Sequence, residues 1–373
     1  MNFQANYPIY LQIAEDIKRR IVIGELKAGD KLPSNAELAL AYQVNPNTVQ
    51  RIYRQLEAEG ISYTKRGIGT FLMEPHGKSG NARAAAAGDR RETKCTISRP
   101  DGNLSFFQRR NHTLAGSTGT ATGERRHIML KFEHVTKVYG GKKALNDLSI
   151  SFQSGHVYAL VGPNGSGKST MMKAAAGLVK INTGSVTYQD MPIGVESKKH
   201  ISYMSTEPFY YDYMKIRDVG QFYADFFEDF DESRFASLLQ FMQLTPDLKV
   251  KALSSGMAAK LKIAATLSRN AEVCMLDEPL NGIDLIGRDQ IIQSILRAAN
   301  PNATILISSH LFDELEPIVD HIVMMANGSL VLEGELEEIR TRYGKSISDL
   351  YREYFSGVSQ PVFPQNPPVN PTV

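Results

Sequence analysis

The nine residues from Gly162 to Thr170 read GPNGSGKST and directly follow the apolar run VYALV. A turn of the pattern GxxxxGK[ST] makes an anion cradle where a strand ends and a helix begins, because backbone N–H groups converge there at the positive end of the helix. The residues that follow continue with a helical pattern. This agreement favours a phosphate site over a simple connecting turn. The sequence therefore predicts an α/β fold that binds a nucleoside triphosphate.

The chemistry of this phosphate loop assigns roles to individual residues. Lys168 would reach the β- and γ-phosphates, and Ser169 would ligate Mg²⁺. The predicted nucleotide-binding residues of the loop are Gly162, Asn164, Gly165, Ser166, Gly167, Lys168, Ser169 and Thr170.

A second candidate element of the same site lies downstream. The unbroken apolar run VCML at 273–276 is typical of a parallel strand covered on both faces, and it ends in Asp277, Glu278 and Pro279. Asp277 would hold Mg²⁺ through water, and Glu278 would polarise the attacking water as the catalytic base. A surface turn is the alternative interpretation of two adjacent carboxylates, and the phosphate loop upstream makes the catalytic one preferable.

With these two elements in place, the C-terminal two thirds resembles the ATP-binding subunit of ABC transporters. The segment LSSGM at 253–257 stands about twenty residues before the carboxylate pair, where that family has its signature. The resemblance implies an α/β P-loop ATPase with a helical subdomain, and it implies ATP and Mg²⁺ as cofactors. It also implies that Ser254 and Gly256 contact the γ-phosphate of ATP held by a second ATPase protomer. In isolation the same residues would be read as a helix N-cap.

Further positions match the family one by one. Tyr139 corresponds to the aromatic residue that stacks on adenine, Asn281 to Asp284 corresponds to the D-loop, and His310 corresponds to the switch histidine that orients Glu278 and water. The resemblance also implies a membrane-spanning partner subunit. Its candidate docking surface is the aromatic run FYY at 209–211, although these rings would also suit the interior.

Two positions depart from the family pattern. Thr206 stands where an amide side chain usually reaches the metal and the attacking water, and its shorter side chain cannot reproduce that ligand. The adjacent residue Glu207 is the alternative candidate for that role, if the loop is shifted by one position. Ser255 replaces a glycine, and its Cβ would crowd a close approach of backbone to phosphate. We expect ATP binding to be retained despite these two departures, and slow or conditional ATP hydrolysis stays open.

The first residues have a different organisation. Ile13, Ile17 and Ile21 form one helical stripe, Ser34 and Glu37 form a capping box, and Asn45 followed by Pro46 opens a third helix. A hairpin is expected after it. This stretch resembles the winged helix-turn-helix of GntR-type regulators, a small α+β fold, and the resemblance implies operator DNA as a partner. The predicted DNA-binding residues are Ser34, Asn47, Thr48, Gln50, Arg51, Arg54, Lys65, Arg66 and Gly67.

The predicted organisation is a DNA-binding domain at 1–75, a linker at 76–128, the ATPase at 129–350 and a tail at 351–373. The linker carries ten Lys and Arg against four Asp and Glu and lacks any sustained period, and the tail is proline-rich, so both are expected to be disordered. Two explanations of the linker remain open. It is an ordinary evolved connector, or a read-through of two neighbouring genes, with the start of the second at Met129.

Composition limits the remaining possibilities. With 42% apolar residues and only two cysteines, the chain supports two packed cores in a reducing compartment. It shows no signal-peptide pattern and no apolar run of about 18 residues, so membrane contact is expected only through a partner. We therefore expect a cytoplasmic transport ATPase, peripheral at the membrane, with an attached regulator. The alternative is a transcription factor that senses ATP and has little transport role. The substrate, its direction of transport and the choice between homodimer and heterodimer stay open.

Overall fold

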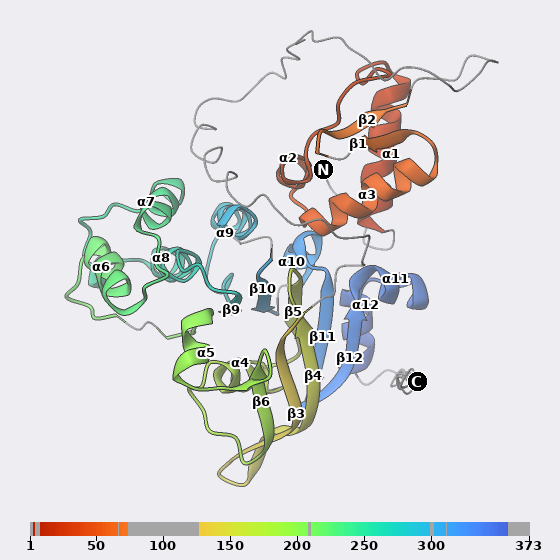
Figure 1. The fold of residues 1–373 in the computed structure, drawn as a ribbon. Coiled ribbons are helices and arrows are strands. Elements are labelled where there is room, and N and C mark those ends of the chain that lie inside the picture. Colours follow the sequence, from red (N-terminus) through yellow and green to blue (C-terminus); the bar gives the residue numbers. More distant parts are fainter. Residues whose placement is uncertain are drawn as a thin grey trace, which may run out of the picture. The chain divides into compact units, whose positions relative to one another are not determined.

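The computed structural model describes residues 3, 8–65, 67–73, 127–207, 210–298, 302–310 and 312–356. Nearly all of the predicted linker, the tail beyond residue 356, Arg66 and Phe209 lie outside these described residues. Two folded parts, the N-terminal domain and the ATPase domain, are therefore described in turn (Figure 1).

The N-terminal domain has three helices and a hairpin: α1 (Ile9–Val22), α2 (Asn35–Tyr42), α3 (Pro46–Ala58), β1 (Ser62–Lys65) and β2 (Gly69–Leu72). The predicted caps are confirmed. Ser34 Oγ accepts from the Glu37 N–H at 3.3 Å while Glu37 Oε2 accepts from the Ser34 N–H at 2.8 Å, and Asn45 caps α3. The apolar faces meet in one core, which includes Ile13, Ile17, Val49, Ile52 and Leu56.

The ATPase domain contains two sheets. The central sheet has the order β12-β11-β5-β10-β9-β8, in which β12 alone runs antiparallel to its neighbour. Its strands are β5 (Val157–Val161), β8 (Ile201–Met204), β9 (Val273–Asp277), β10 (Thr304–Ser308), β11 (His321–Ala326) and β12 (Ser329–Glu335). Since β5, β9 and β10 are parallel neighbours, their carboxyl ends meet at one edge, where the predicted site residues follow.

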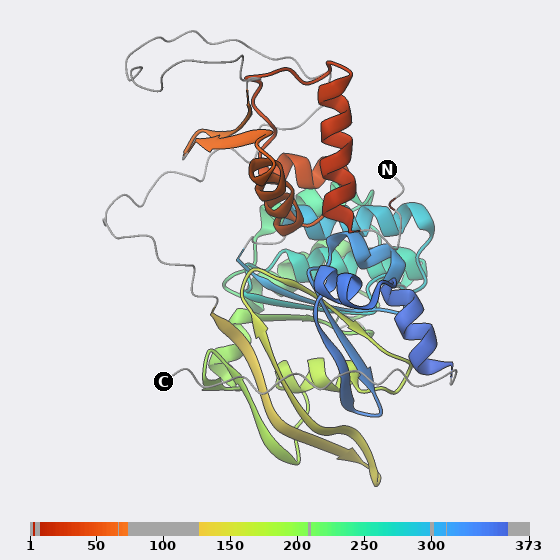
Figure 2. The same cartoon turned by 90° about the vertical axis from the view of Figure 1, so that its right-hand side faces the viewer.

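The second sheet is antiparallel, with the order β4-β3-β6-β7. Its strands are β3 (Ile128–Tyr139), β4 (Lys142–Gln153), β6 (Thr183–Tyr188) and β7 (Met191–Pro192). One buried cluster joins this sheet, helix α4 (Lys168–Ala175) and the near face of the central sheet, and it includes Phe132, Phe152, Leu160, Met171 and Met275. Figure 2 shows the long strands β3 and β4 (yellow) beside the central sheet.

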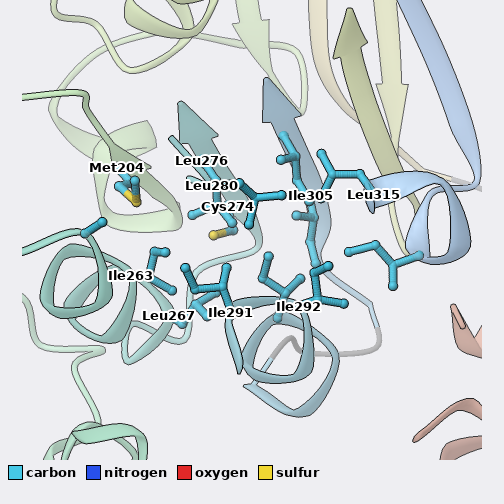
Figure 3. Close-up of a cluster of buried hydrophobic side chains, with 14 of the residues drawn as sticks. Met204, Ile263, Leu267, Cys274, Leu276, Leu280, Ile291, Ile292, Ile305 and Leu315 are labelled. Atoms are coloured by element: carbon cyan, nitrogen blue, oxygen red, sulfur yellow. The ribbon is translucent and has the colours of Figure 1, made fainter. Parts of the chain in front are cut away.

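Helices α8 (Ser255–Leu267) and α9 (Leu285–Ala298) pack on the opposite face of the central sheet. Helices α6 (Ile216–Phe226) and α7 (Glu232–Phe241) pack against these two helices, and the short helix η1 (Val250–Ala252) precedes α8. Aliphatic side chains of α8 and α9 point toward β9 and β10 in Figure 3, where the labelled residues of these four elements are Ile263, Leu267, Cys274, Leu276, Ile291, Ile292 and Ile305. The expected helical subdomain is present, and most of its aromatic stripe is core, although Phe226 is 69% exposed.

The remaining elements are α5 (Val195–His200), α10 (Phe312–Leu315), η2 (Glu316–Ile318), α11 (Leu336–Tyr343) and α12 (Ile347–Phe355). Helix α12 runs through the predicted boundary at residue 350, because Ile347 and Leu350 are buried in the ATPase core. Among the described residues, no helix combines the length and apolar character that crossing a bilayer requires.

Candidate functional site

The phosphate loop connects β5, which lies at the centre of the sheet, to the start of α4. Two glycines are required sterically. A Cβ at Gly162 would lie 2.3 Å from the Met325 carbonyl oxygen, and a Cβ at Gly167 would lie 2.5 Å from the Ala144 carbonyl oxygen. Gly167 also has a φ of +111°, which L side chains rarely adopt. The backbone is therefore packed against its neighbours in a way that only glycine permits.

The polar side chains of the loop fit a polyanion. Lys168 is 6% exposed, and its Nζ donates to the carbonyl oxygens of Gly162 at 2.6 Å and Pro163 at 3.2 Å. Burial lowers the Lys168 pKa, and the carboxylates of Glu278 and Asp277 oppose that shift. Ser166 Oγ is buried and has no hydrogen-bond partner among the described residues. A buried cation beside an unpartnered hydroxyl is chemically suited to phosphate oxygens.

Asp277 ends β9 and is 1% exposed. Its Oδ1 accepts from Ser308 Oγ at 2.6 Å and from Ser169 Oγ at 3.0 Å, and its Oδ2 accepts from the Tyr203 hydroxyl at 3.2 Å. The carboxylate and the Ser169 hydroxyl thus lie together at the mouth of the phosphate loop. Hard oxygen ligands of this kind are what Mg²⁺ prefers, so the residues present fit the ion.

Glu278 follows in a left-handed backbone conformation, with a φ of +50°. The conformation is held by Ser308, because the Glu278 N–H donates to Ser308 Oγ at 2.9 Å and to the Ser308 carbonyl oxygen at 3.2 Å. His310 Nδ1 lies 2.9 Å from Glu278 Oε2. Strained backbone at a held carboxylate is a common property of active sites. The structure therefore brings together the pair that the sequence placed 32 positions apart.

Sequence reasoning missed Ser308 and Tyr203. Ser308 pairs with Asp277 in the register of β10 and β9, and Tyr203 belongs to β8 on the other side of β9. The available signal was a polar residue in or at the end of each apolar strand. Using that signal requires knowing which strands are neighbours in the sheet, and sequence motifs do not give the strand order.

The signature turn lies apart from the phosphate loop. Ser254 caps α8 by accepting from the Met257 N–H at 3.3 Å, and no hydrogen bond or ion pair joins Ser254 to the phosphate loop within the described chain. Space is open at Gly256, where an added Cβ would meet nothing nearer than the Gly282 carbonyl oxygen at 3.9 Å. Ser255 is exposed. The turn is thus accessible to solvent, with Ser254 and Ser255 both exposed.

Tyr139 ends β3 and is 47% exposed, with Lys137 Nζ 4.6 Å from the centre of its ring. Thr206 is also exposed, and its carbonyl oxygen accepts from Lys262 Nζ at 2.7 Å.

The predicted aromatic docking surface needs a correction. Tyr210 is 7% exposed and directs its hydroxyl to the Ala258 carbonyl oxygen at 3.4 Å, so it packs inside and its predicted role on the surface is wrong. Tyr211 is 60% exposed and stacks on Tyr213, which is 72% exposed, at 5.4 Å between ring centres. The exposed pair is therefore Tyr211 and Tyr213.

The predicted DNA contacts lie on α3 and the hairpin. Gln50 and Arg54 are exposed on α3, opposite the buried face, and Asn47, Thr48 and Arg51 belong to the same helix. Ser34 uses its hydroxyl in the cap of α2. Lys65 and Gly67 are exposed at the hairpin tip, and Arg66 lies outside the described residues.

Comparison with known proteins follows the same division. Residues 145–281 match the family model described as "ABC transporter", and residues 9–72 match "Bacterial regulatory proteins, gntR family". The lantibiotic transport ATP-binding protein SrtF of Streptococcus pyogenes is 34% identical over 211 residues, which cover 56% of this chain and 92% of SrtF. The linearmycin resistance ATP-binding protein LnrL of Bacillus subtilis is 29% identical over 224 residues, which cover 58% of this chain and 72% of LnrL.

A solved structure titled as the ATP-binding subunit of an ABC transporter matches 60% of this chain and 98% of its own, with a TM-score of 0.56 and 24% identity. That likeness supports the fold. The chain belongs to the ABC transporter ATP-binding proteins, and it carries a GntR-family regulatory domain at its N-terminus.

Proposed function

We propose that this chain is the ATP-hydrolysing subunit of an ABC transporter, joined to a DNA-binding regulator. The observation that carries the proposal is the hydrogen-bonded row at the sheet edge, in which Ser169 contacts Asp277 and His310 contacts Glu278 beside Lys168. Each residue has the chemistry that phosphoryl transfer to water requires.

In this proposal Lys168 and the loop N–H groups bind the phosphates, while Ser169 and Asp277 hold Mg²⁺. The bound ion would supply charge neutralisation at the phosphate oxygens. Glu278 accepts a proton from the attacking water, and His310 fixes the orientation of that carboxylate at 2.9 Å. Tyr139 offers an exposed ring for stacking on adenine.

A second copy of the chain would complete the site. Ser254 and Gly256 are accessible at the start of α8, whose N-terminus is favourable for an anion. ATP held by one phosphate loop would then be covered by the signature turn of the other copy, and hydrolysis would release the pair.

A membrane-spanning partner at the cytoplasmic face of the membrane would receive the resulting motion. The stacked pair Tyr211 and Tyr213 is our proposed contact, because exposed aromatic rings are enriched in protein interfaces. Arg54 and Gln50 on α3 would read operator DNA.

The proposal is tested by Glu278→Gln, which preserves shape and removes the base. We expect MgATP affinity to stay within about twofold and turnover to fall by about 10²-fold or more. Wild-type turnover in this variant would remove Glu278 from its assigned role.

A second candidate function is ATP sensing by a transcription factor with little turnover. It is favoured by Thr206, which is too short to act as the expected amide ligand. Operator affinity that changes with ATP in the absence of any membrane partner supports this second function. Co-purification with a membrane protein supports the first.

Arg54→Ala should weaken operator binding at fixed salt, and unchanged affinity would exclude Arg54 from the contact.

A further inference from the structure

One lysine of the signature helix α8 points to the loop that follows β8. Lys262 lies between Leu261 and Ile263, which are both 0% exposed, and its own side chain is half-buried. Its Nζ donates to the carbonyl oxygen of Thr206 at 2.7 Å and to that of Ser205 at 3.3 Å. An ammonium group donating to two consecutive carbonyls fixes the backbone of this loop from the side of the helix.

The position of this loop matters because the preceding strand reaches the phosphate site. Tyr203 of β8 donates to Asp277 Oδ2 at 3.2 Å, and Ser205 is 6% exposed. Burial lowers the Lys262 pKa, and the Asp277 carboxylate opposes part of that shift. Lys262 thus holds, by hydrogen bonds, the loop that directly follows the strand whose Tyr203 contacts Asp277.

The side chain of Thr206 does not supply an amide to the site, so the loop cannot be held there in the way that a glutamine would hold it. The contact with Lys262 is made through the backbone and does not depend on the side chain at position 206. Lys262 is also eight residues along the same helix from Ser254, about 12 Å at the rise of an α-helix. A movement of the signature turn would consequently carry Lys262 with it.

We propose that Lys262 is a positioning residue for ATP hydrolysis, which holds the Ser205–Thr206 backbone at the phosphate site in place of an amide side chain at position 206. The loop then moves with the signature helix, so its position depends on the pairing of two copies. This inference rests on the proposed hydrolytic function.

A matched control lies on the same helix. Lys260 is also half-buried, but its Nζ donates to Gln290 Oε1 of α9 at 2.6 Å, away from the loop. Lys260→Met and Lys262→Met remove the same charge from the same helix and differ in the partner that is lost.

The experiment compares full-length wild type, Lys262→Met, Lys262→Arg, Lys260→Met and the double variant Thr206→Gln with Lys262→Met. The measurements are kcat and KM for MgATP, the Kd for labelled ATP, and the thermal midpoint of unfolding. Lys262→Met should lower kcat by about tenfold or more, since charge-assisted hydrogen bonds are lost, with Kd changed by less than about twofold. Arginine at 262, and glutamine at 206 in the double variant, should each recover most of the loss, and Lys260→Met should behave as wild type.

The proposal is overturned if Lys262→Met retains the wild-type kcat, if Lys260→Met loses as much, if ATP affinity falls in parallel with kcat, or if neither rescue raises kcat. Should Lys262→Met unfold at the assay temperature, Lys262→Gln replaces it under the same criteria. Absence of hydrolysis by wild type would instead contradict the proposed function, which keeps the two failures distinct.

Discussion

Replacing Ser308 with alanine tests whether this buried hydroxyl holds the two carboxylates of the site. Ser308 is 0% exposed, donates to Asp277 Oδ1 at 2.6 Å and accepts from the Glu278 N–H at 2.9 Å. The variant loses one hydrogen bond to a buried charge, which contributes about 1.5–3 kcal/mol. The Glu278 N–H also loses the hydroxyl as an acceptor, but it still donates to the Ser308 carbonyl oxygen at 3.2 Å, so this second loss costs less free energy of unfolding.

We therefore expect Ser308→Ala to destabilise the ATPase domain by about 2–3 kcal/mol, which lowers its thermal midpoint by roughly 4–12 °C for a domain of this size. Circular dichroism of the full-length protein follows the transition. Turnover should fall as well, because the left-handed backbone at Glu278 loses a restraint.

Ser268→Ala is the control. Ser268 is also 0% exposed, but its Oγ donates to the Ala264 carbonyl oxygen, which already accepts from the Ser268 N–H at 3.1 Å. Loss of the Ser268 hydroxyl leaves no buried charge uncompensated, so the free energy of unfolding should fall by less than about 1 kcal/mol. Equal shifts in the two variants would refute the argument that Ser308 acts through Asp277.

Three further predictions follow from the site and the core. His310→Ala should lower kcat roughly 10²-fold with little change in ATP affinity, because Glu278 loses its 2.9 Å contact; a wild-type kcat would contradict this. Gly167→Ala should weaken ATP binding by about tenfold or more, because its Cβ would meet the Ala144 carbonyl oxygen at 2.5 Å, and unchanged binding in equilibrium dialysis would show that the loop adapts. Burial raises the pKa of Cys274 to about 12, so only about 10⁻⁴ of this side chain is thiolate at pH 8. We therefore expect a maleimide reagent to label Cys274 in urea and not in buffer, and peptide mapping checks this.

The phosphate loop, the capping box at Ser34 and the N-cap at Asn45 were predictable because their determinants are contiguous in the chain. Each depends on residues within a few positions of one another, and local geometry suffices to identify them. The two domain types were inferred from the resemblance of these and neighbouring segments to two families, and the comparisons agree with both.

The network around Asp277 was not predictable in the same way. Ser169 and Asp277 were expected at the same metal ion, but Tyr203 and Ser308 were not expected there, and these two meet Asp277 because β9 lies between β8 and β10. The order of parallel strands depends on crossover connections, which no short motif encodes.

The aromatic run at 209–211 illustrates a second limit. An apolar run in a loop does not show which ring faces the core, and Tyr210 is buried whereas Tyr211 is exposed. The role of Lys262 was also hidden, because its contact with Thr206 spans 56 positions and uses a backbone oxygen.

The central claim is that the ATP site built around Lys168 of one copy is completed by Ser254 of another copy. Its most direct test mixes Lys168→Ala with Ser254→Arg and measures hydrolysis. Each variant alone lacks a complete site, while a mixed pair regains one, so we predict near-zero rates alone and roughly a quarter of the wild-type rate in an equal mixture. A mixture no more active than its separate components, or a single variant with the wild-type rate, would contradict the claim.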